Sequence, residues 1–153
     1  MIPWGGMLAY PLLHPEILAA LGRAGHGAKV LIADGNYPSS TTLGPNARLV
    51  SLNLSPGVVS GPQVLAALAS AIPIEAAGVM QYATSGPEGL TTDPPIWARY
   101  AQILHDAGVD VDLERIERFA FYEASRGRDV ALTIATGELA LYANLMLRIG
   151  VVG

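Results

Sequence analysis

The residues best suited to chemistry are a histidine and an aspartate that flank one short apolar run. His26 stands between Gly25 and Gly27, and Asp34 directly follows residues 30–33. An apolar run of this length suits a buried strand and is too short for a helix. In open α/β sheets, ligands bind beyond the carboxyl ends of the strands, which is where Asp34 falls. We therefore assign His26 and Asp34 to one site. The distance between them depends on how the loop before the strand folds back, or on a neighbouring subunit.

A plain structural explanation of the same two residues stays open. A histidine between glycines also fits a tight loop, and an aspartate after a strand also fits a cap on the turn that Gly35, Asn36 and Pro38 predict. The chemical interpretation has its own support, because imidazole titrates near neutral pH and can act as a general acid or a general base.

Two further pairs of polar residues have spacings that put each pair on a shared face. Arg118 and Tyr122 are four residues apart on a predicted helix. Tyr142 and Asn144 are two apart near a predicted strand. Guanidinium, phenol and amide groups together can hydrogen-bond the hydroxyls of a sugar. The alternatives are a surface arginine beside a half-buried tyrosine, and an ordinary polar pair on a strand.

Other kinds of site have weaker support. The three histidines, His14, His26 and His105, are far apart in sequence and lack clustered carboxylates, so we expect no metal site. No Gly-x-Ser-x-Gly motif is present for a serine nucleophile. No glycine-rich turn follows a strand, which disfavours a nucleotide-binding module. Glu138 suits an ion pair with an arginine of another subunit or a turn, and we favour the turn.

Strands that alternate with helices must position these side chains. The sequence predicts strands over residues 29–33, 48–52, 78–82, 130–135 and 143–149, and helices over 15–21, 61–72, 96–107 and 113–125. Gly137 lies between the last two strands and favours a hairpin there. This order predicts an α/β layered domain with a mostly parallel sheet and a C-terminal antiparallel hairpin.

Bulk properties limit the class of protein further. The 153 residues suit one domain, 1–153, and the net charge of −4 without a basic block argues against a nucleic-acid partner. No long apolar run predicts a membrane span, and residues 1–13 do not resemble a signal peptide. The absence of cysteine fits a reducing compartment, so we expect a cytoplasmic protein.

The scarcity of charge points to self-association. Charged residues make up 14% of the chain, against about 25% in average soluble domains. A small domain with so few charges can bury apolar surface against copies of itself, so we expect a homo-oligomer. The alternative is a monomer that is merely rich in alanine and glycine.

Four motifs in order resemble the ribose pyranase and fucose mutarotase (RbsD/FucU-like) family over nearly the whole chain. They occupy residues 12–18, 25–38, 118–123 and 135–144, with the sequences LLHPEIL, GHGAKVLIADGNYP, RFAFYE and ATGELALYAN. The Arg-Phe-x-Phe-Tyr-Glu form is similar to the fucose branch. The loop over residues 84–92 does not match the family pattern, and about two extra residues lie within Ser125 to Asp129.

The resemblance implies an enzyme that interconverts the anomers of a monosaccharide, with L-fucose as the first candidate, without cofactor or metal. It implies a Rossmann-like fold and rings, often decamers, with sites near subunit interfaces. D-ribose pyranase activity and a non-catalytic sugar-binding or transport-accessory role stay open as alternatives. By the matched motifs, the catalytic residues are His26, Asp34 and Tyr122, and the substrate contacts are Arg118, Tyr142 and Asn144.

Overall fold

A computed structural model describes residues 7–153, and its elements alternate along the chain much as the sequence predicts. The first six residues, which belong to the stretch tested above for a signal peptide, lie outside the described part. The helices are α1 (Pro15–Arg23), α2 (Gly61–Ala69), α3 (Pro95–Asp106) and α4 (Arg118–Ser125). The strands are β1 (Lys29–Ala33), β2 (Arg48–Ser51), β3 (Ile74–Met80), β4 (Leu113–Ile116), β5 (Val130–Ala135) and β6 (Leu145–Ile149).

The six strands form one sheet in the order β2-β5-β1-β6-β3-β4. All neighbouring strands are parallel except β6, which runs antiparallel to both β1 and β3. The prediction of a mostly parallel α/β sheet is therefore confirmed. The predicted hairpin of the last two strands is wrong, because β1 lies between β5 and β6.

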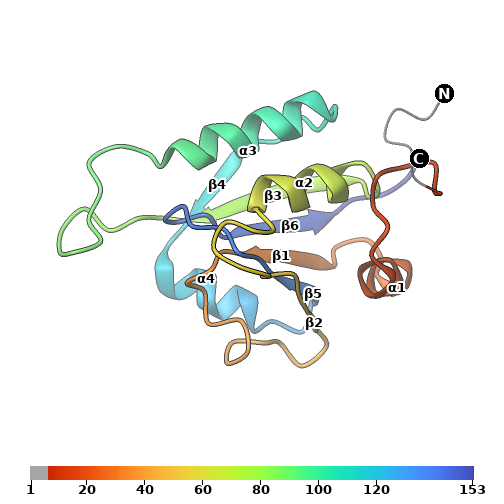
Figure 1. Ribbon diagram of the computed structural model, residues 1–153, viewed down its shortest axis with the longest axis horizontal. Coiled ribbons are helices and arrows are strands. Elements are labelled where there is room, and N and C mark those ends of the chain that lie inside the picture. Colours follow the sequence, from red (N-terminus) through yellow and green to blue (C-terminus); the bar gives the residue numbers. More distant parts are fainter. Residues whose placement is uncertain (1–6) are drawn as a thin grey trace.

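Helices cover both faces of this sheet (Figure 1). Alternate residues of β1 point to opposite faces, as expected for a strand buried on both sides. Val30 and Ile32 face the larger core, which α1, α2 and α3 complete. Leu31 and Ala33 face a smaller core, which Phe121 of α4 completes. The sheet is thus the middle of three layers, and β1 is its buried centre.

Three predicted elements differ in the structure. Residues 113–125 were expected to form one helix, but they form β4 and then α4. The break falls at Glu117, whose carboxylate accepts hydrogen bonds from the main-chain N–H groups of Phe119 and Ala120 and so begins the helix. β3 begins at Ile74, four residues before the predicted start, and β6 begins at Leu145, two residues after it. Within the described residues, no helix is long and apolar enough to cross a membrane.

Candidate functional site

A cavity of ≈ 330 Å³ opens beyond the carboxyl end of β1. This volume lies in the range of about 300–1,000 Å³ that is usual for small-molecule sites. Five of the six predicted site residues line it: Asp34, Arg118, Tyr122, Tyr142 and Asn144. They come from the end of β1, from α4 and from the segment before β6, so the fold gathers three separate motifs at one edge of the sheet.

Asp34 is the buried anchor of this cavity, with only 5% of its surface exposed. Its Oδ1 accepts a hydrogen bond from the N–H of Asn36 at 3.0 Å, and its Oδ2 accepts one from the N–H of Ala143 at 3.3 Å. Burial raises the pKa of the carboxyl above its ordinary value, although these N–H groups oppose the shift. Glu138 nearby adds a smaller contribution that also raises it. The fold therefore holds Asp34 in one orientation at an energetic cost.

Helix α3 fixes the segment that carries Tyr142 and Asn144. The indole N–H of Trp97 donates to the carbonyl oxygen of Tyr142 at 2.8 Å, and the hydroxyl of Tyr100 donates to that of Ala143 at 2.7 Å. The Oδ1 of Asn144 accepts from the N–H of Asp34 at 2.8 Å. Its amide nitrogen has no partner among the described residues and is left for a ligand. Tyr142 and Asn144 both precede β6, so the prediction that Asn144 lies within the last strand is wrong, yet both residues line the cavity.

A glycine makes room for this anchoring. A Cβ at Gly61, the first residue of α2, would lie 2.1 Å from the hydroxyl oxygen of Tyr100. A side chain at this position would push Tyr100 away from the carbonyl of Ala143. The N–H of Gly61 also donates to Oε1 of Glu138, whose Oε2 accepts from the N–H groups of Leu139 and Ala140. In this chain, Glu138 is therefore a carboxylate of the turn, as favoured from sequence.

Arg118 and Tyr122 share one side of α4 and reach the same cavity. The ring of Tyr122 stacks on Tyr37, with centroids 5.6 Å apart and planes 18° apart. Its hydroxyl has no hydrogen-bond partner within residues 7–153. The Nη1 of Arg118 lies 3.9 Å from Oε2 of Glu88, across the mouth of the cavity. A phenol and a guanidinium are thus available to a ligand beside the Asp34 carboxylate.

The hydroxyl of Tyr142, in contrast, is already engaged. It accepts a hydrogen bond from the N–H of Ala83 at 3.1 Å and donates one to the carbonyl oxygen of Glu88 at 3.1 Å. Tyr142 also has a φ of 55°, which is uncommon for a residue other than glycine. Its ring lines the cavity while its hydroxyl holds the loop between β3 and α3.

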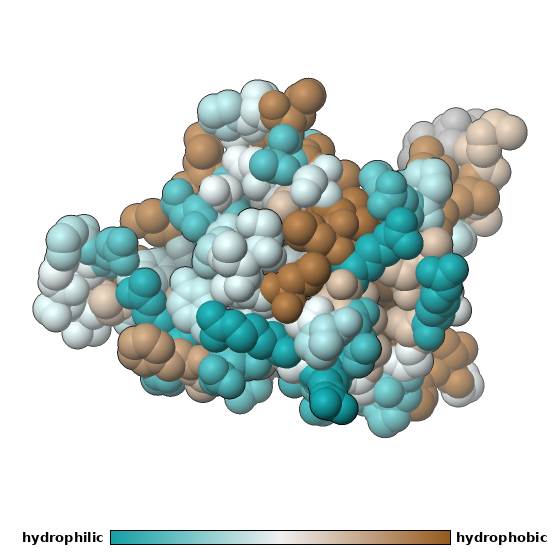
Figure 2. All heavy atoms as spheres, turned by 90° about the horizontal axis from the view of Figure 1, so that it is seen from below, coloured by the Kyte–Doolittle hydropathy of each residue, from teal (hydrophilic) through white to brown (hydrophobic). Residues whose placement is uncertain are grey.

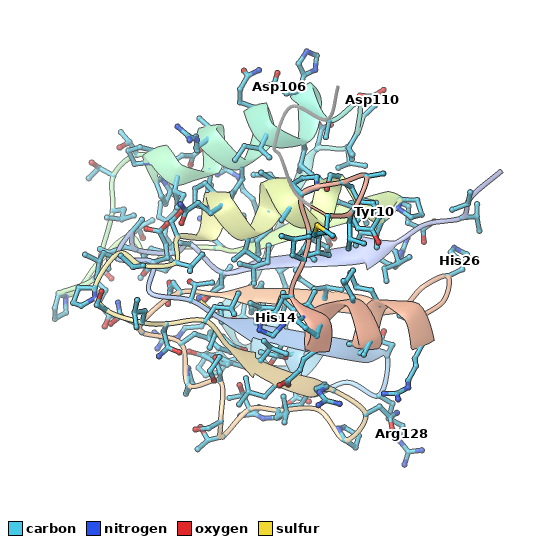
Figure 3. All side chains as sticks on the ribbon, turned by 45° about the vertical axis from the view of Figure 1, so that its right-hand side comes forward. Tyr10, His14, His26, Asp106, Asp110 and Arg128 are labelled. Carbon is cyan, nitrogen blue, oxygen red and sulfur yellow. The ribbon has the colours of Figure 1, made fainter. Side chains whose placement is uncertain are left out.

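His26 lies at the other end of β1 (Figure 3). It precedes the strand, whereas Asp34 follows it, and a strand of five residues spans roughly 17 Å. The explanation in which the preceding loop folds back to Asp34 is therefore wrong for a single chain. What stays open is a site completed by His26 of a neighbouring copy.

His26 has a carboxylate partner that the sequence did not indicate. Its Nε2 lies 3.0 Å from both carboxylate oxygens of Glu75, and the Nε of Arg148 lies 2.8 Å from Oε1 of the same group. Glu75 is in β3 and Arg148 in β6, and the pairing of these strands brings them together. No motif marks Glu75, and it precedes the predicted strand. Such a carboxylate fixes the orientation of an imidazole.

The two ends of β1 differ in the charged side chains around them. The cavity at the carboxyl end is lined by Asp34, Glu88 and Arg118. The loop with His26 borders a hollow of ≈ 550 Å³ that Arg23, Arg48 and Arg128 also line.

Within the described part of the chain, no group of three or more histidine, cysteine, aspartate or glutamate side chains gathers closely enough to hold a metal ion.

Comparison with known proteins gives consistent results. Residues 7–152 match the RbsD / FucU transport protein family. The fucose mutarotase of Homo sapiens is 40% identical over 148 residues, covering 92% of this chain and 90% of that protein. The crystal structure of FucU from Bifidobacterium longum is similar with a TM-score of 0.77 and 35% identity, covering 94% of this chain and 99% of that one.

A second solved structure contains a sugar. It is the fucose mutarotase of Streptococcus pneumoniae in complex with L-fucose, with a TM-score of 0.73 and 29% identity, covering 92% of this chain and 94% of that one. The matches span the motifs that form the cavity. The chain therefore belongs to the RbsD/FucU family and is an isomerase of the sugar mutarotase type.

Proposed function

We propose that the chain is one mutarotase domain that interconverts the α and β anomers of L-fucose without a cofactor. The observation that carries the proposal is the cavity in which Asp34, Arg118, Tyr122 and Asn144 present a carboxylate, a guanidinium, a phenol and an amide side by side. These groups suit a neutral, hydroxyl-rich ligand. The 40% identity with a fucose mutarotase supports L-fucose as the sugar.

Anomer exchange requires two proton transfers. A base removes the proton of the C1 hydroxyl as the bond from C1 to the ring oxygen breaks, and an acid protonates that oxygen. The open aldehyde then turns, and the reverse steps close the ring on the other carbonyl face. One placed acid or base contributes typically about 10²–10⁴-fold. No electron donor or acceptor is needed, so side chains alone suffice.

We assign the proton transfer at C1 to His26 and that at the ring oxygen to Tyr122. Tyr122 is favoured over Tyr142 because its hydroxyl has no partner among the described residues, whereas that of Tyr142 has two. Asp34 then holds a sugar hydroxyl and Glu75 orients the imidazole. Arg118 and Asn144 donate to the remaining hydroxyls.

In this proposal His26 comes from a neighbouring copy of the chain. The imidazole is 58% exposed in one chain, and the hollow beside it contains none of the residues that line the Asp34 cavity. Exposed apolar side chains support contact between copies, since Phe119 is 74% exposed and Leu139 is 65% exposed. Figure 2 shows apolar residues on the surface in several patches among hydrophilic ones. Association of copies would cover such patches and bring His26 to a second cavity.

Saturation-transfer NMR on L-fucose tests the proposal, with D-ribose as the comparison sugar. We expect the parent protein to accelerate exchange of the fucose anomers and His26→Ala to fall at least about 100-fold below it. His105→Ala, an exposed histidine of α3 outside the cavity, is the matched control and should keep the parent rate. Equal exchange by His26→Ala and the parent would refute the assignment of His26. Exchange of the forms of D-ribose without exchange of the L-fucose anomers would indicate a D-ribose pyranase instead.

A further inference from the structure

The loop between β3 and α3 forms part of the cavity and does not follow the family pattern seen in the sequence. It projects from one end of the molecule, at the left in Figures 1 and 2. The loop is closed on itself, because the N–H of Leu90 donates to the carbonyl of Ala83 at 2.8 Å and that of Gly89 donates to Gly86 at 3.1 Å. Its shape is therefore set by its own main chain.

Tyr142 holds this loop against the cavity. Its single hydroxyl bonds to the loop twice, at the N–H of Ala83 and at the carbonyl of Glu88, each at 3.1 Å. α3 fixes the main chain of Tyr142 in turn, through the indole of Trp97. Glu88 is thus placed by the same residues that shape the sugar cavity.

The side chain of Glu88 lines the cavity and faces its single lining cation. Arg118 is the only lysine or arginine among the described lining residues, whereas the carboxylates are Asp34 and Glu88. The separation of 3.9 Å between Nη1 of Arg118 and Oε2 of Glu88 allows electrostatic attraction but is too long for a direct hydrogen bond, and the two side chains are 52% and 68% exposed. With Glu88 present, two negative groups stand against one positive group.

We propose that Glu88 is a specificity-determining residue that restricts the enzyme to neutral sugars. Glu88 neutralises Arg118, and together with Asp34 it repels a sugar that carries a carboxylate. Without Glu88, the guanidinium of Arg118 would be free to form a two-pronged ion pair with the carboxylate of a uronic acid. The assignment depends on the proposed function, because it deepens the description of the same cavity.

The test compares three sugars that differ at one carbon. L-Fucose has a methyl group at C6, L-galactose has a hydroxymethyl group, and L-galacturonate has a carboxylate. We expect the parent to exchange the anomers of the two neutral sugars and to leave L-galacturonate near the buffer rate. In Glu88→Gln, which keeps the shape and removes the charge, we expect exchange of L-galacturonate to rise at least about tenfold while that of L-fucose stays within about threefold.

A matched control distinguishes the effect of Glu88 in the cavity from a general effect of removing one negative charge. Glu123 also pairs with an arginine of the same helix region, Arg126, at 3.7 Å, but lies outside the cavity. Glu123→Gln should leave all three rates unchanged. An unchanged rate for L-galacturonate in Glu88→Gln, or an equal rise in Glu123→Gln, would overturn the proposal.

A binding measurement distinguishes failure of this inference from failure of the proposed function. NMR titration gives the ratio of the Kd values for L-galacturonate and L-fucose whether or not exchange is catalysed. The inference predicts that Glu88→Gln lowers this ratio at least about tenfold. If the parent leaves L-fucose at the buffer rate, the proposed function fails. An unchanged Kd ratio would overturn the role of Glu88 by itself.

Discussion

The two ends of β1 differ in how much of a binding site a single chain supplies there. At the carboxyl end, Asp34 is 5% exposed and shares hydrogen bonds with Asn36, Ala143 and Asn144. At the amino end, the His26 side chain is 58% exposed and has one carboxylate partner, Glu75. The first end is a walled cavity with groups aimed into it. The second is an exposed imidazole on a loop beside a hollow that Arg23, Arg48 and Arg128 line.

This difference shows which site side chains a single chain can hold in a fixed orientation without a partner copy. Buried polar groups must be satisfied by fixed partners, so the carboxyl end is rigid before any ligand arrives. An exposed imidazole gains a low-polarity environment only when something covers it. The contrast is therefore the reason to assign His26 to a cavity in a second copy, and experiments that break one end at a time can test it.

The largest expected effect comes from two variants, each of which changes the key side chain at one end of β1. We expect His26→Ala and Asp34→Asn each to lower anomer exchange at least about 100-fold. When the two variants are refolded together, about a quarter of shared sites would combine an intact His26 from one copy with an intact Asp34 from another. Saturation-transfer NMR on the mixture should show a matching recovery of exchange.

The control for this mixture is His26→Ala refolded with the double variant of both residues. It contains no intact His26 and should stay inactive. If the first mixture also stays inactive although the copies associate, the two residues do not act together across copies.

A smaller effect is expected from the carboxylate beside His26. Glu75→Gln keeps a hydrogen-bonding group but removes the charge that holds the imidazole, so we expect anomer exchange to fall about tenfold. The free energy of unfolding should change by less than about 1 kcal/mol, because the group is partly exposed. Glu16→Gln is the matched control, since Glu16 pairs with Arg48 at 3.3 Å on the surface. An equal loss of activity in both variants would show that Glu75 has no special role.

The smallest expected effect concerns stability at the carboxyl end. Burial raises the pKa of Asp34 in the folded chain above the ordinary value of 3.8. The folded state therefore holds the proton more tightly than the unfolded state does, and the stability that this contributes is complete below pH 3.8. It is lost as the pH rises through the folded-state pKa.

Denaturant unfolding of the parent and of Asp34→Asn at several pH values measures this. The free energy of unfolding of the parent, relative to the variant, should decrease as the pH rises from below 3.8 towards neutral. A difference that is constant with pH would mean that folding does not raise the pKa of the Asp34 carboxyl.

Local patterns predicted where several residues at the carboxyl end of β1 lie, while their grouping into one site came from the resemblance to the RbsD/FucU family. The short run in β1 and the turn after it placed Asp34 beyond a strand, and the helical spacing of Arg118 and Tyr122 put them on one side of α4. The alternation of strands and helices, each recognised from its local pattern, also predicted the mostly parallel sheet. These features depend on residues close in sequence, whose periodicity reports on burial directly.

Features set by long-range strand pairing could not be predicted in this way. Residues 113–116 have a spacing compatible with a helix, and they form β4 because β3 offers a free edge. Glu75 of β3 reaches His26 across β6, which lies between β1 and β3 and also places Arg148 beside Glu75. Neither fact leaves a local signal, because each depends on partners dozens of residues away.

The position of β6 also has a consequence for how the chain acquires its fold during synthesis. This strand is the last in chain order, yet it lies in the interior of the sheet between β1 and β3. Until it emerges from the ribosome, these two strands expose unpaired edges that can pair with other nascent chains. The sheet therefore closes only after the other five strands have been made, and the window before that moment is when these strands are most exposed to aggregation.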